Sequence, residues 1–291
     1  MHRPQWSRFV AVVVTALAAL PAVAAPAGAD TPTLCPDAGG SVFGGFPLPP
    51  GTGEASGLVA STRHPGWGWV IRDSGNPPDL YAVRFPGAVA PHALRAIRVL
   101  GATNVDWEDI SEQDGRLYVT ESDQSRRARY IYEIPEPDPL GPPRVHFSAR
   151  YRYAYPNGQR VNTETTFFFA GHFVLVPKTT PAQLYRFDHP LRPDRVNVPR
   201  FVGRLPGSDT VSLARVSPDG RTLVLANHEM LFAYRTPASA VWLRDFVSRP
   251  VHRKRIDAGD NVEGGDFFPL GRCKLVLVAE SRDVYRLLLP R

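Results

Sequence analysis

Asp106-Trp107-Glu108-Asp109-Ile110 opens a stretch whose layout recurs along the chain. An acid stands at the head of a first strand, and the Asp114-Gly115 turn leads into a second, apolar run, Leu117–Thr120. A loop then leads to a third, tyrosine-bearing run, Tyr130–Pro135. Short runs rich in aromatic and aliphatic residues and bounded by Gly, Pro and Asp are typical of strands. The stretch therefore predicts three consecutive strands joined by short connections.

The same layout appears five times, at a step of roughly 50 residues, which lies within the period of propeller blades. The second strand follows a glycine each time: Gly66, Gly115, Gly171, Gly220 and Gly271. The third strand pairs an aromatic residue with a proline at or past its end: Tyr81/Pro86, Tyr132/Pro135, Tyr185/Pro190, Phe232/Pro237 and Tyr285/Pro290. The repeats predict an all-β fold, a β-propeller with five blades. Six blades is the alternative, because segments 137–160 and 237–250 are long enough to hide strands.

The fourth strand of each blade is predicted from the remaining apolar runs. These runs are Leu94–Leu100, Val145–Tyr155, Arg200–Leu205 and Val251–Asp257. Ala238–Val247 is predicted as one or two helical turns that decorate blade four, with Val241, Trp242 and Phe246 facing inward.

The fifth repeat ends without a fourth strand, whereas an unassigned strand, Ser41–Phe46, precedes the first repeat. We expect this N-terminal strand to complete the last blade, because closing the ring removes an exposed edge. Cys35 lies just before it and Cys273 begins the second strand of the last repeat. An exported chain with two cysteines favours a disulfide, and a Cys35–Cys273 pair would lock the closure.

Residues 1–29 have the features of a secretory signal peptide. Arg3 and Arg8 flank the start of an apolar run, and Ala27-Gly28-Ala29 is a small-x-small cleavage pattern. The run is shorter than the roughly 20 apolar residues of a membrane anchor, so we expect a secreted protein without a transmembrane segment after cleavage. The predicted domains are a signal peptide at 1–29, a segment with the disulfide cysteine at 30–40, and one propeller at 41–291.

The formal net charge of +6 comes from 34 basic and 28 acidic residues. The basic run His252–Arg255 is either a polyanion patch or an edge strand that carries charges against aggregation, and we favour the edge strand. Nucleic acid is therefore not an expected partner. We expect a monomer that binds a small molecule or a cell-envelope ligand at the propeller mouth.

Polar residues recur at the heads of the first strands and at the ends of the second. In a propeller both positions face the mouth of the central channel, so two rings of side chains are predicted there. The first ring contains Glu54, Glu108 with Asp109, Glu164, Ser212 and Glu263. The second contains Asp73, Glu121, Lys178, Asn227 and Glu280, with Arg282 as a counter-charge.

Four carboxylates at one mouth cannot all stay ionised without compensation. Protons, arginine partners or a hard cation would each supply it, and Ca²⁺ accepts six to eight oxygen ligands in loose geometry. The predicted Ca²⁺ ligands are Glu54, Glu108, Asp109, Glu164 and Glu263. The alternative is that each Glu bonds nearby backbone N–H groups and keeps the blades in register. No nucleophile elbow, zinc-binding helix or phosphate loop is present, so no catalytic residue is assigned.

Segments across most of the chain resemble exported actinobacterial β-propeller proteins related to the esterase-like, phytase-like propellers. The matching segments are Glu54–Leu58, Asp73–Gly75, Leu80–Val83, Asp106–Ile110, Ile131–Pro137, Tyr155–Gly158, Val216–Gly220 and Val284–Arg286. The resemblance implies export and a propeller fold, with an esterase-like or phytase-like activity.

The chain departs from that group at two motifs. Thr120–Ser125 stands where the relatives carry Gly-Asp-x-Gly-Asp-Asn, and Val161–Thr165 where they carry Asp-Ala-Glu-Ala. Two functions therefore stay open. One is a Ca²⁺-assisted hydrolase of an ester, lactone or phosphoester; the other is a non-catalytic extracellular binding propeller.

Overall fold

The structure is a computed structural model that describes residues 42–48, 50–85, 92–123, 125, 129–236, 242–249, 251–256, 261–268, 274–280 and 283–288. The chain divides into the units Met1–Thr31 and Pro32–Arg291, and every described residue belongs to the second. The predicted signal peptide, the Cys35–Cys273 disulfide and Arg282 lie outside the described residues. They stay predictions.

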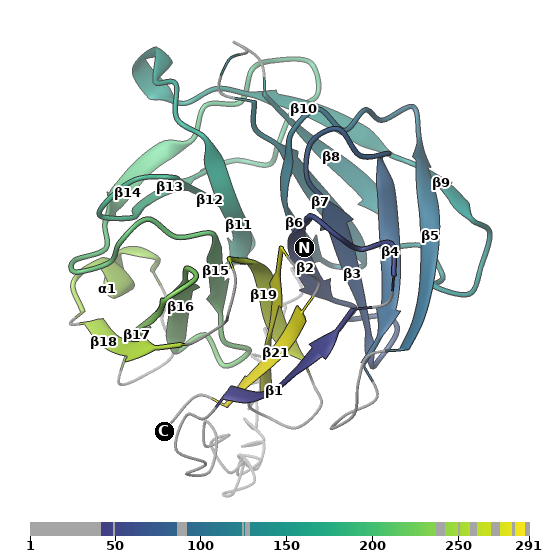
Figure 1. Ribbon diagram of the computed structural model, residues 1–291. Helices are drawn as coiled ribbons and strands as arrows, with labels where there is room; N and C mark the ends of the chain where they lie inside the picture. Colours follow the sequence, from purple (N-terminus) through teal and green to yellow (C-terminus); the bar gives the residue numbers. More distant parts are fainter. Residues whose placement is uncertain are drawn as a thin grey trace, which may run out of the picture. The chain divides into compact units, whose positions relative to one another are not determined.

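The described residues form five sheets, one for each predicted repeat (Figure 1). Blade one consists of β2 (Ala55–Ala60), β3 (Trp67–Arg72), β4 (Asp79–Arg84), β5 (His92–Leu100) and β9 (Arg144–His146). Blade two consists of β6 (Trp107–Gln113), β7 (Arg116–Glu121), β8 (Arg129–Pro135) and β10 (Ala149–Tyr153). Blade three consists of β11 (Thr163–Phe169), β12 (His172–Pro177), β13 (Gln183–Arg186) and β14 (Arg200–Arg204).

Blade four consists of β15 (Leu213–Val216), β16 (Thr222–Ala226), β17 (Met230–Arg235) and β18 (Val251–Arg255). Blade five consists of β19 (Val262–Phe268), β20 (Lys274–Ala279), β21 (Asp283–Leu288) and β1 (Val42–Pro47). The first strands of the five blades, β2, β6, β11, β15 and β19, contact one another in turn around a common centre (Figure 1). This arrangement is the β-propeller that the repeats predict.

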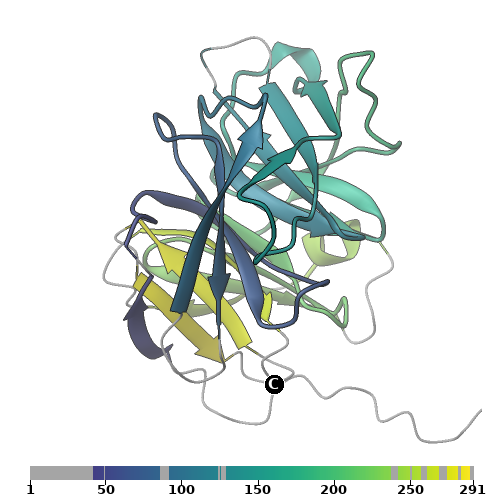
Figure 2. The same ribbon diagram turned by 90° about the vertical axis from the view of Figure 1, so that its right-hand side faces the viewer.

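The ring closes through the N-terminal strand, as predicted. β1 pairs antiparallel with β21, from Val42 opposite Leu287 to Pro47 opposite Asp283. Figure 2 shows the purple β1 beside the yellow β21. The pairing covers the edge that the last blade would otherwise expose.

The first-to-second strand turn of blade two is built by its two-residue sequence. Asp114 and Gly115 both have positive φ, at 52° and 72°. Two consecutive positive φ values define the turn whose twist matches that of the flanking strands, and Asp-Gly is a favoured pair for it.

The predicted fourth strand of blade two, Val145–Tyr155, is wrong as a single strand. Residues 149–153 form β10 in blade two, whereas β9 pairs in parallel with β5 and extends blade one. Ser148 lies between the two strands, and its N–H donates to the carbonyl of Glu133. The alternating pattern runs through both strands, so it gives no sign of the change of partner.

The predicted helical turns of Ala238–Val247 are shorter than expected. Within the described part of this segment, helix α1 spans Arg244–Val247. Phe246 is buried, but Trp242 is 54% exposed, and Leu243 occupies the inward position instead. Val241 lies outside the described residues.

Aromatic and aliphatic side chains fill the interfaces between neighbouring blades. Trp69 of blade one and Trp107 and Tyr132 of blade two lie in one buried cluster. Phe167 of blade three packs with Leu225 and Phe232 of blade four in another. Among the described residues, no helix has the length and hydropathy needed to cross a membrane.

Candidate functional site

A β-bulge recurs near the head of the first strand in four blades. The pairing register shifts between Ala55 and Gly57, Trp107 and Asp109, Thr163 and Thr165, and Val262 and Gly264. Each shift leaves one extra residue on the inner strand, and these residues are Ser56, Glu108, Glu164 and Glu263. A bulge leaves its extra residue unpaired and re-aims its side chain. The bulges therefore single out three glutamates at matching positions.

Backbone hydrogen bonds fix the alignment of the strand heads. Asp73 N–H donates to Glu54 O, Ser122 to Asp106 O, Lys178 to Asn162 O and Glu280 to Asn261 O. Glu54 therefore occupies the position of Asp106 and Asn162, and Ser56 occupies the position of Glu108. The prediction that Glu54 is equivalent to the other three glutamates is wrong by two residues.

Glu54 has surroundings of its own at the edge of blade one. Its side chain is 61% exposed and lies 3.6 Å from the Arg72 guanidinium. The side-chain amide of Asn76 donates to the Glu54 carboxylate at 2.9 Å. This carboxylate is thus paired with its own blade and does not join the other glutamates.

Glu108, Glu164 and Glu263, with Asn162 and Lys178, form what we call the mouth cluster. The Asn162 amide donates to Glu108 at 2.5 Å and to Glu164 at 3.0 Å, and so it bridges two blades. Lys178 Nζ lies 3.1 Å from Glu164 Oε2. Glu164 is 4% exposed, and Lys178 is the cation at ion-pair distance from it.

The mouth cluster holds protons more tightly than isolated glutamates do. Burial, followed by the nearby Glu164 and Asp106 carboxyls, raises the pKa of Glu108 to about 10. Burial and then Glu164 raise the pKa of Glu263 to about 7, although Lys178 acts in the opposite direction. Glu263 therefore changes its charge near neutral pH.

Asp106 joins this group, although it was not predicted as a site residue. Burial raises its pKa most, Asp73 raises it further, and a hydrogen bond from Glu108 acts in the opposite direction. Asp106 and Glu108 therefore act on each other's pKa.

The predicted second ring is only partly formed. Asp73, Lys178 and Glu280 occupy matching positions, because each donates its N–H to the residue at its strand head. Glu121 stands one position earlier and is buried. Asn227 holds a turn instead, since its Oδ1 accepts the N–H groups of Glu229 and Met230.

Asp109 does not belong to the mouth, contrary to the prediction. Its two carboxylate oxygens each lie 2.9 Å from an Arg215 nitrogen, and both side chains are almost fully buried. Asp266 lies 3.9 Å from the same guanidinium. We call Arg215, Asp109 and Asp266 the axial cluster.

Arg215 reaches all five inner strands. Its guanidinium donates to the carbonyls of Leu58 on β2, Ile110 on β6, Thr166 on β11 and Ala214 on β15. Its contact with Asp266 adds β19. The axial cluster therefore closes the centre of the propeller with polar bonds from every blade.

Glycine makes room for this cluster. A Cβ on Gly57 would lie 3.0 Å from both Asp109 Oδ1 and the backbone N of Ile110. A Cβ on Gly264 would lie 2.7 Å from Gly57 Cα, so neither position accepts a larger residue without a backbone shift.

Lys178, predicted in the second ring, joins the mouth cluster through Glu164. Asp106 and Asn162 are the two residues of the mouth that were not predicted. Their signal in the sequence is the spacing to the glutamate two positions later, Asp106 to Glu108 and Asn162 to Glu164. Among the described residues, no group of three or more His, Cys, Asp or Glu side chains is arranged to hold a metal ion. With Asp109 in the axial cluster and Glu54 elsewhere, the predicted Ca²⁺ ligands do not form one set.

Comparison with known proteins supports the fold. No protein-family model and no curated protein matches the sequence. A glutaminyl cyclase from Myxococcus xanthus has a similar structure, with a TM-score of 0.53 at 14% identity over 86% of this chain and 96% of that chain. The WD40 β-propeller domain of Doa1 matches with a TM-score of 0.47 at 8% identity over 87% of this chain and 98% of that chain. A virginiamycin B lyase from Staphylococcus aureus gives 0.43 at 12% identity over 83% of this chain and 68% of that chain. At 14% identity the likeness to the glutaminyl cyclase extends to the fold alone.

Proposed function

We propose that this propeller is an exported hydrolase that cleaves an ester, lactone or phosphoester at the mouth cluster. The observation that supports the proposal is the position of Glu263. It stands on a β-bulge beside the Glu164–Lys178 pair, and its pKa of about 7 is close to the pH at which it would work. A general acid–base group is most effective when its pKa lies near the working pH.

In the proposed reaction, Glu263 moves the proton. A water molecule adds to the carbonyl carbon or the phosphorus and gives a proton to the Glu263 carboxylate. Glu263 then returns a proton to the leaving oxygen, so the products are an acid and an alcohol and Glu263 regains its starting charge. Bulges are frequent next to active sites because they aim a side chain out of the regular pleat.

Lys178 supplies the positive charge in this proposal. Its ammonium bonds Glu164 at 3.1 Å, and its side chain is 59% exposed. An ammonium has three donors, so Lys178 can bond Glu164 and also a substrate oxygen. A fixed cation beside an oxygen that gains negative charge stabilises the transition state. Glu108, which Asn162 links to Glu164, lies beside this pair.

Ca²⁺ has no step in this reaction, because the predicted ligands do not form one set among the described residues. It stays a proposal that a chelator tests. Equal activity and equal melting temperature in Ca²⁺ and in chelator would remove the metal and leave the Glu263 reaction intact.

The test is a substrate panel with two matched variants. The panel holds a fluorogenic acetate ester, a lactone and an aryl phosphate. Because a glutaminyl cyclase shares this fold, it also holds a peptide with N-terminal glutamine. Glu263→Gln should lower turnover by about 10²-fold or more, whereas Glu54→Gln, the same change at an exposed glutamate, should leave it unchanged. Equal turnover by wild type and Glu263→Gln would refute the assignment.

A non-catalytic binding propeller is the second candidate. The observation that favours it is that Glu164 already has a counter-charge in Lys178. No turnover across the panel, together with a mouth ligand that raises the melting temperature, would favour this alternative. Mass spectrometry of protein secreted by the native host tests export, which predicts a mature chain that begins at Asp30.

A further inference from the structure

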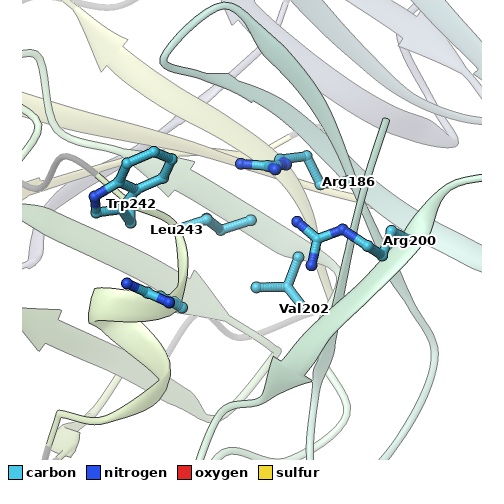
Figure 3. A pocket seen from close by; sticks show the side chains of 6 residues that line it. Arg186, Arg200, Val202, Trp242 and Leu243 are labelled. Carbon is cyan, nitrogen blue, oxygen red and sulfur yellow. The ribbon is translucent and has the colours of Figure 1, made fainter. Parts of the chain in front are cut away.

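A pocket on the outer part of blade three lies apart from the inner strands that carry the mouth. Its lining comes from β13, β14 and the segment that contains α1, and we call it the outer pocket. It is lined by Arg186, Arg200, Val202, Trp242, Leu243 and Arg244, with a volume of about 240 Å³. Figure 3 shows Trp242 and Leu243 facing Arg186, Arg200 and Val202 across it.

The outer pocket carries more positive charge than its own acids neutralise. Asp188 accepts a hydrogen bond from Arg186 Nε at 2.9 Å and another from Arg200 Nε at 2.7 Å. These bonds, that from Arg200 first, lower the pKa of Asp188 to about 2. Arg244 has no carboxylate within ion-pair distance in the part of the chain that the structure describes. Three guanidinium groups therefore line a pocket with two carboxylates beside it: Asp188, which bonds Arg186 and Arg200, and Asp245, whose Oδ2 accepts the Trp242 backbone N–H at 3.1 Å.

Trp242 gives the outer pocket an aromatic wall. Its side chain is 54% exposed, and the Arg244 guanidinium carbon lies 5.9 Å from the ring centroid. The segment is fixed by other residues, because Phe246 is buried and packs edge-on against Phe169 at 5.6 Å. The exposure of Trp242 is thus a feature of an anchored segment.

The floor of the outer pocket is apolar. Leu243 is 1% exposed, and Val202 packs against the same buried cluster. Apolar floor, aromatic wall and cationic rim together match a compact molecule that has an apolar ring face and a negative group. Arginine binds carboxylate and sulfate oxygens through two parallel N–H donors.

We propose that the outer pocket binds a small ring-bearing organic anion, with a carboxylate or sulfate on a sugar or aromatic ring. The negative group lies between Arg200 and Arg244, and the ring face stacks on Trp242 above Val202 and Leu243. An inorganic anion would bond the arginines but would not cover the exposed part of the indole. The outer pocket shares no residue with the mouth cluster, so this proposal is tested independently of the proposed hydrolase.

The test is a two-dimensional NMR titration of the folded chain with glucuronate, benzoate, glucose and inorganic sulfate. Glucuronate, benzoate or both should shift the Trp242 indole signal, and their dissociation constants should be lower than those of glucose and sulfate. Binding of glucuronate alone identifies an acidic sugar, and binding of benzoate alone identifies an aromatic acid. Arg244→Gln, followed at the Trp242 indole signal, should weaken binding by about tenfold or more, the loss expected for one charge-assisted contact. Trp242→Ala lacks that signal and is followed at the backbone amide signals of the pocket; it should weaken binding by a similar factor.

Arg150→Gln is the matched control. Arg150 lies on β10 with its guanidinium carbon 4.6 Å from the Tyr130 ring, so it is also an arginine over an aromatic ring. It does not line the outer pocket, and its replacement should leave the titration unchanged. The proposal is overturned if sulfate binds as tightly as the ring-bearing anions, if Trp242→Ala binds like wild type while it melts at the same temperature, or if none of the probes binds.

Discussion

The mouth cluster and the axial cluster stand on the same inner strands, yet their carboxyls are in opposite electrical situations. Glu108 and Asp109 are neighbours in the chain. Asp109 has an Arg215 nitrogen 2.9 Å from each of its oxygens. Glu108 has Asp106 and Glu164 as its charged neighbours, and its pKa rises to about 10. Burial is common to both, and the two carboxyls differ in the counter-charge beside them.

The difference separates the work of the two clusters. Arg215 ties the five inner strands together, so the axial cluster is a structural element. The mouth cluster contains a carboxyl, Glu263, whose charge changes near neutral pH, and proton transfer requires such a group. Variants of either cluster test this difference.

Removal of Arg215 should have the largest effect on stability. Arg215→Met leaves Asp109 and Asp266 buried without a cation, and breaking a buried pair in this way costs about 3–5 kcal/mol. Urea denaturation would measure the loss as a lower midpoint at an unchanged slope.

A double variant separates lost charge from lost packing. Replacement of both partners of a buried ion pair by apolar residues is often neutral or stabilising, so Asp109→Leu with Arg215→Met should recover part of the loss. Arg215 does not have this structural role if the unfolding free energy of Arg215→Met lies within about 0.5 kcal/mol of the wild-type value, which is the range of a surface substitution.

The stability of the protein should fall as the pH rises. Glu108 and Glu263 have pKa values in the folded state above the ordinary glutamate value. The folded state thus binds more protons than the unfolded state above pH 4.5, and stability falls as the pH rises toward about 7 for Glu263 and about 10 for Glu108. Between pH 5 and pH 8 the contribution of Glu263 alone should fall by on the order of 2 kcal/mol, and Glu108 adds to the fall throughout this range.

Glutamine variants assign this fall to its residues. Glu263→Gln should flatten the profile below about pH 7, and Glu108→Gln should flatten it at higher pH as well, since neither amide titrates. Denaturation midpoints measured across this range give the profile. If both variants keep the wild-type slope, the protons are held elsewhere and the mouth cluster is not the titrating group.

The sequence predicts the propeller because its repeats are local. Each blade needs a turn glycine, an apolar second strand and an aromatic third strand, and these recur at a constant step. The closing strand is also predictable. The last repeat lacks a fourth strand and a spare strand precedes the first repeat, so the spare strand is expected to complete the last blade. The carboxyl-rich mouth is predictable in outline, because Glu108, Glu164 and Glu263 do occupy matching positions.

The details of the site depend on contacts that no local pattern carries. A bulge adds one residue to a strand, and this is why Glu54 is mistaken for the equivalent of Glu108 when Ser56 is the equivalent. The Asp109–Arg215 pair joins residues 106 positions apart, on different blades, so spacing cannot reveal it. The prediction that Trp242 faces inward is wrong for a similar reason. Trp242 and the adjacent Leu243 are both large and apolar, and only packing decides which one is buried.

Lys178→Gln should have a smaller effect on stability than the two changes above. Its ammonium is the cation that contacts Glu164, but its side chain is 59% exposed, and solvent screens such a pair. The expected loss is about 0.5 kcal/mol. Lys178 also lowers the pKa of Glu263, so the variant should raise that pKa. NMR titration of the Glu263 side-chain carbon measures the shift, and an unchanged pKa would show that Lys178 does not act on Glu263.

Glu54→Gln should have the smallest effect. Glu54 lies 3.6 Å from Arg72 and is 61% exposed, and ion pairs of this kind contribute little. The amide can still accept the hydrogen bond from Asn76 that the carboxylate accepts at 2.9 Å. We expect a change in unfolding free energy within about 0.5 kcal/mol and a pH profile identical to that of wild type. If Glu54→Gln instead flattened the profile as Glu263→Gln is expected to do, Glu54 would belong to the mouth cluster. The register set by the Ala55–Gly57 bulge would then be wrong, and the separation of the two clusters would have to be drawn again from blade one.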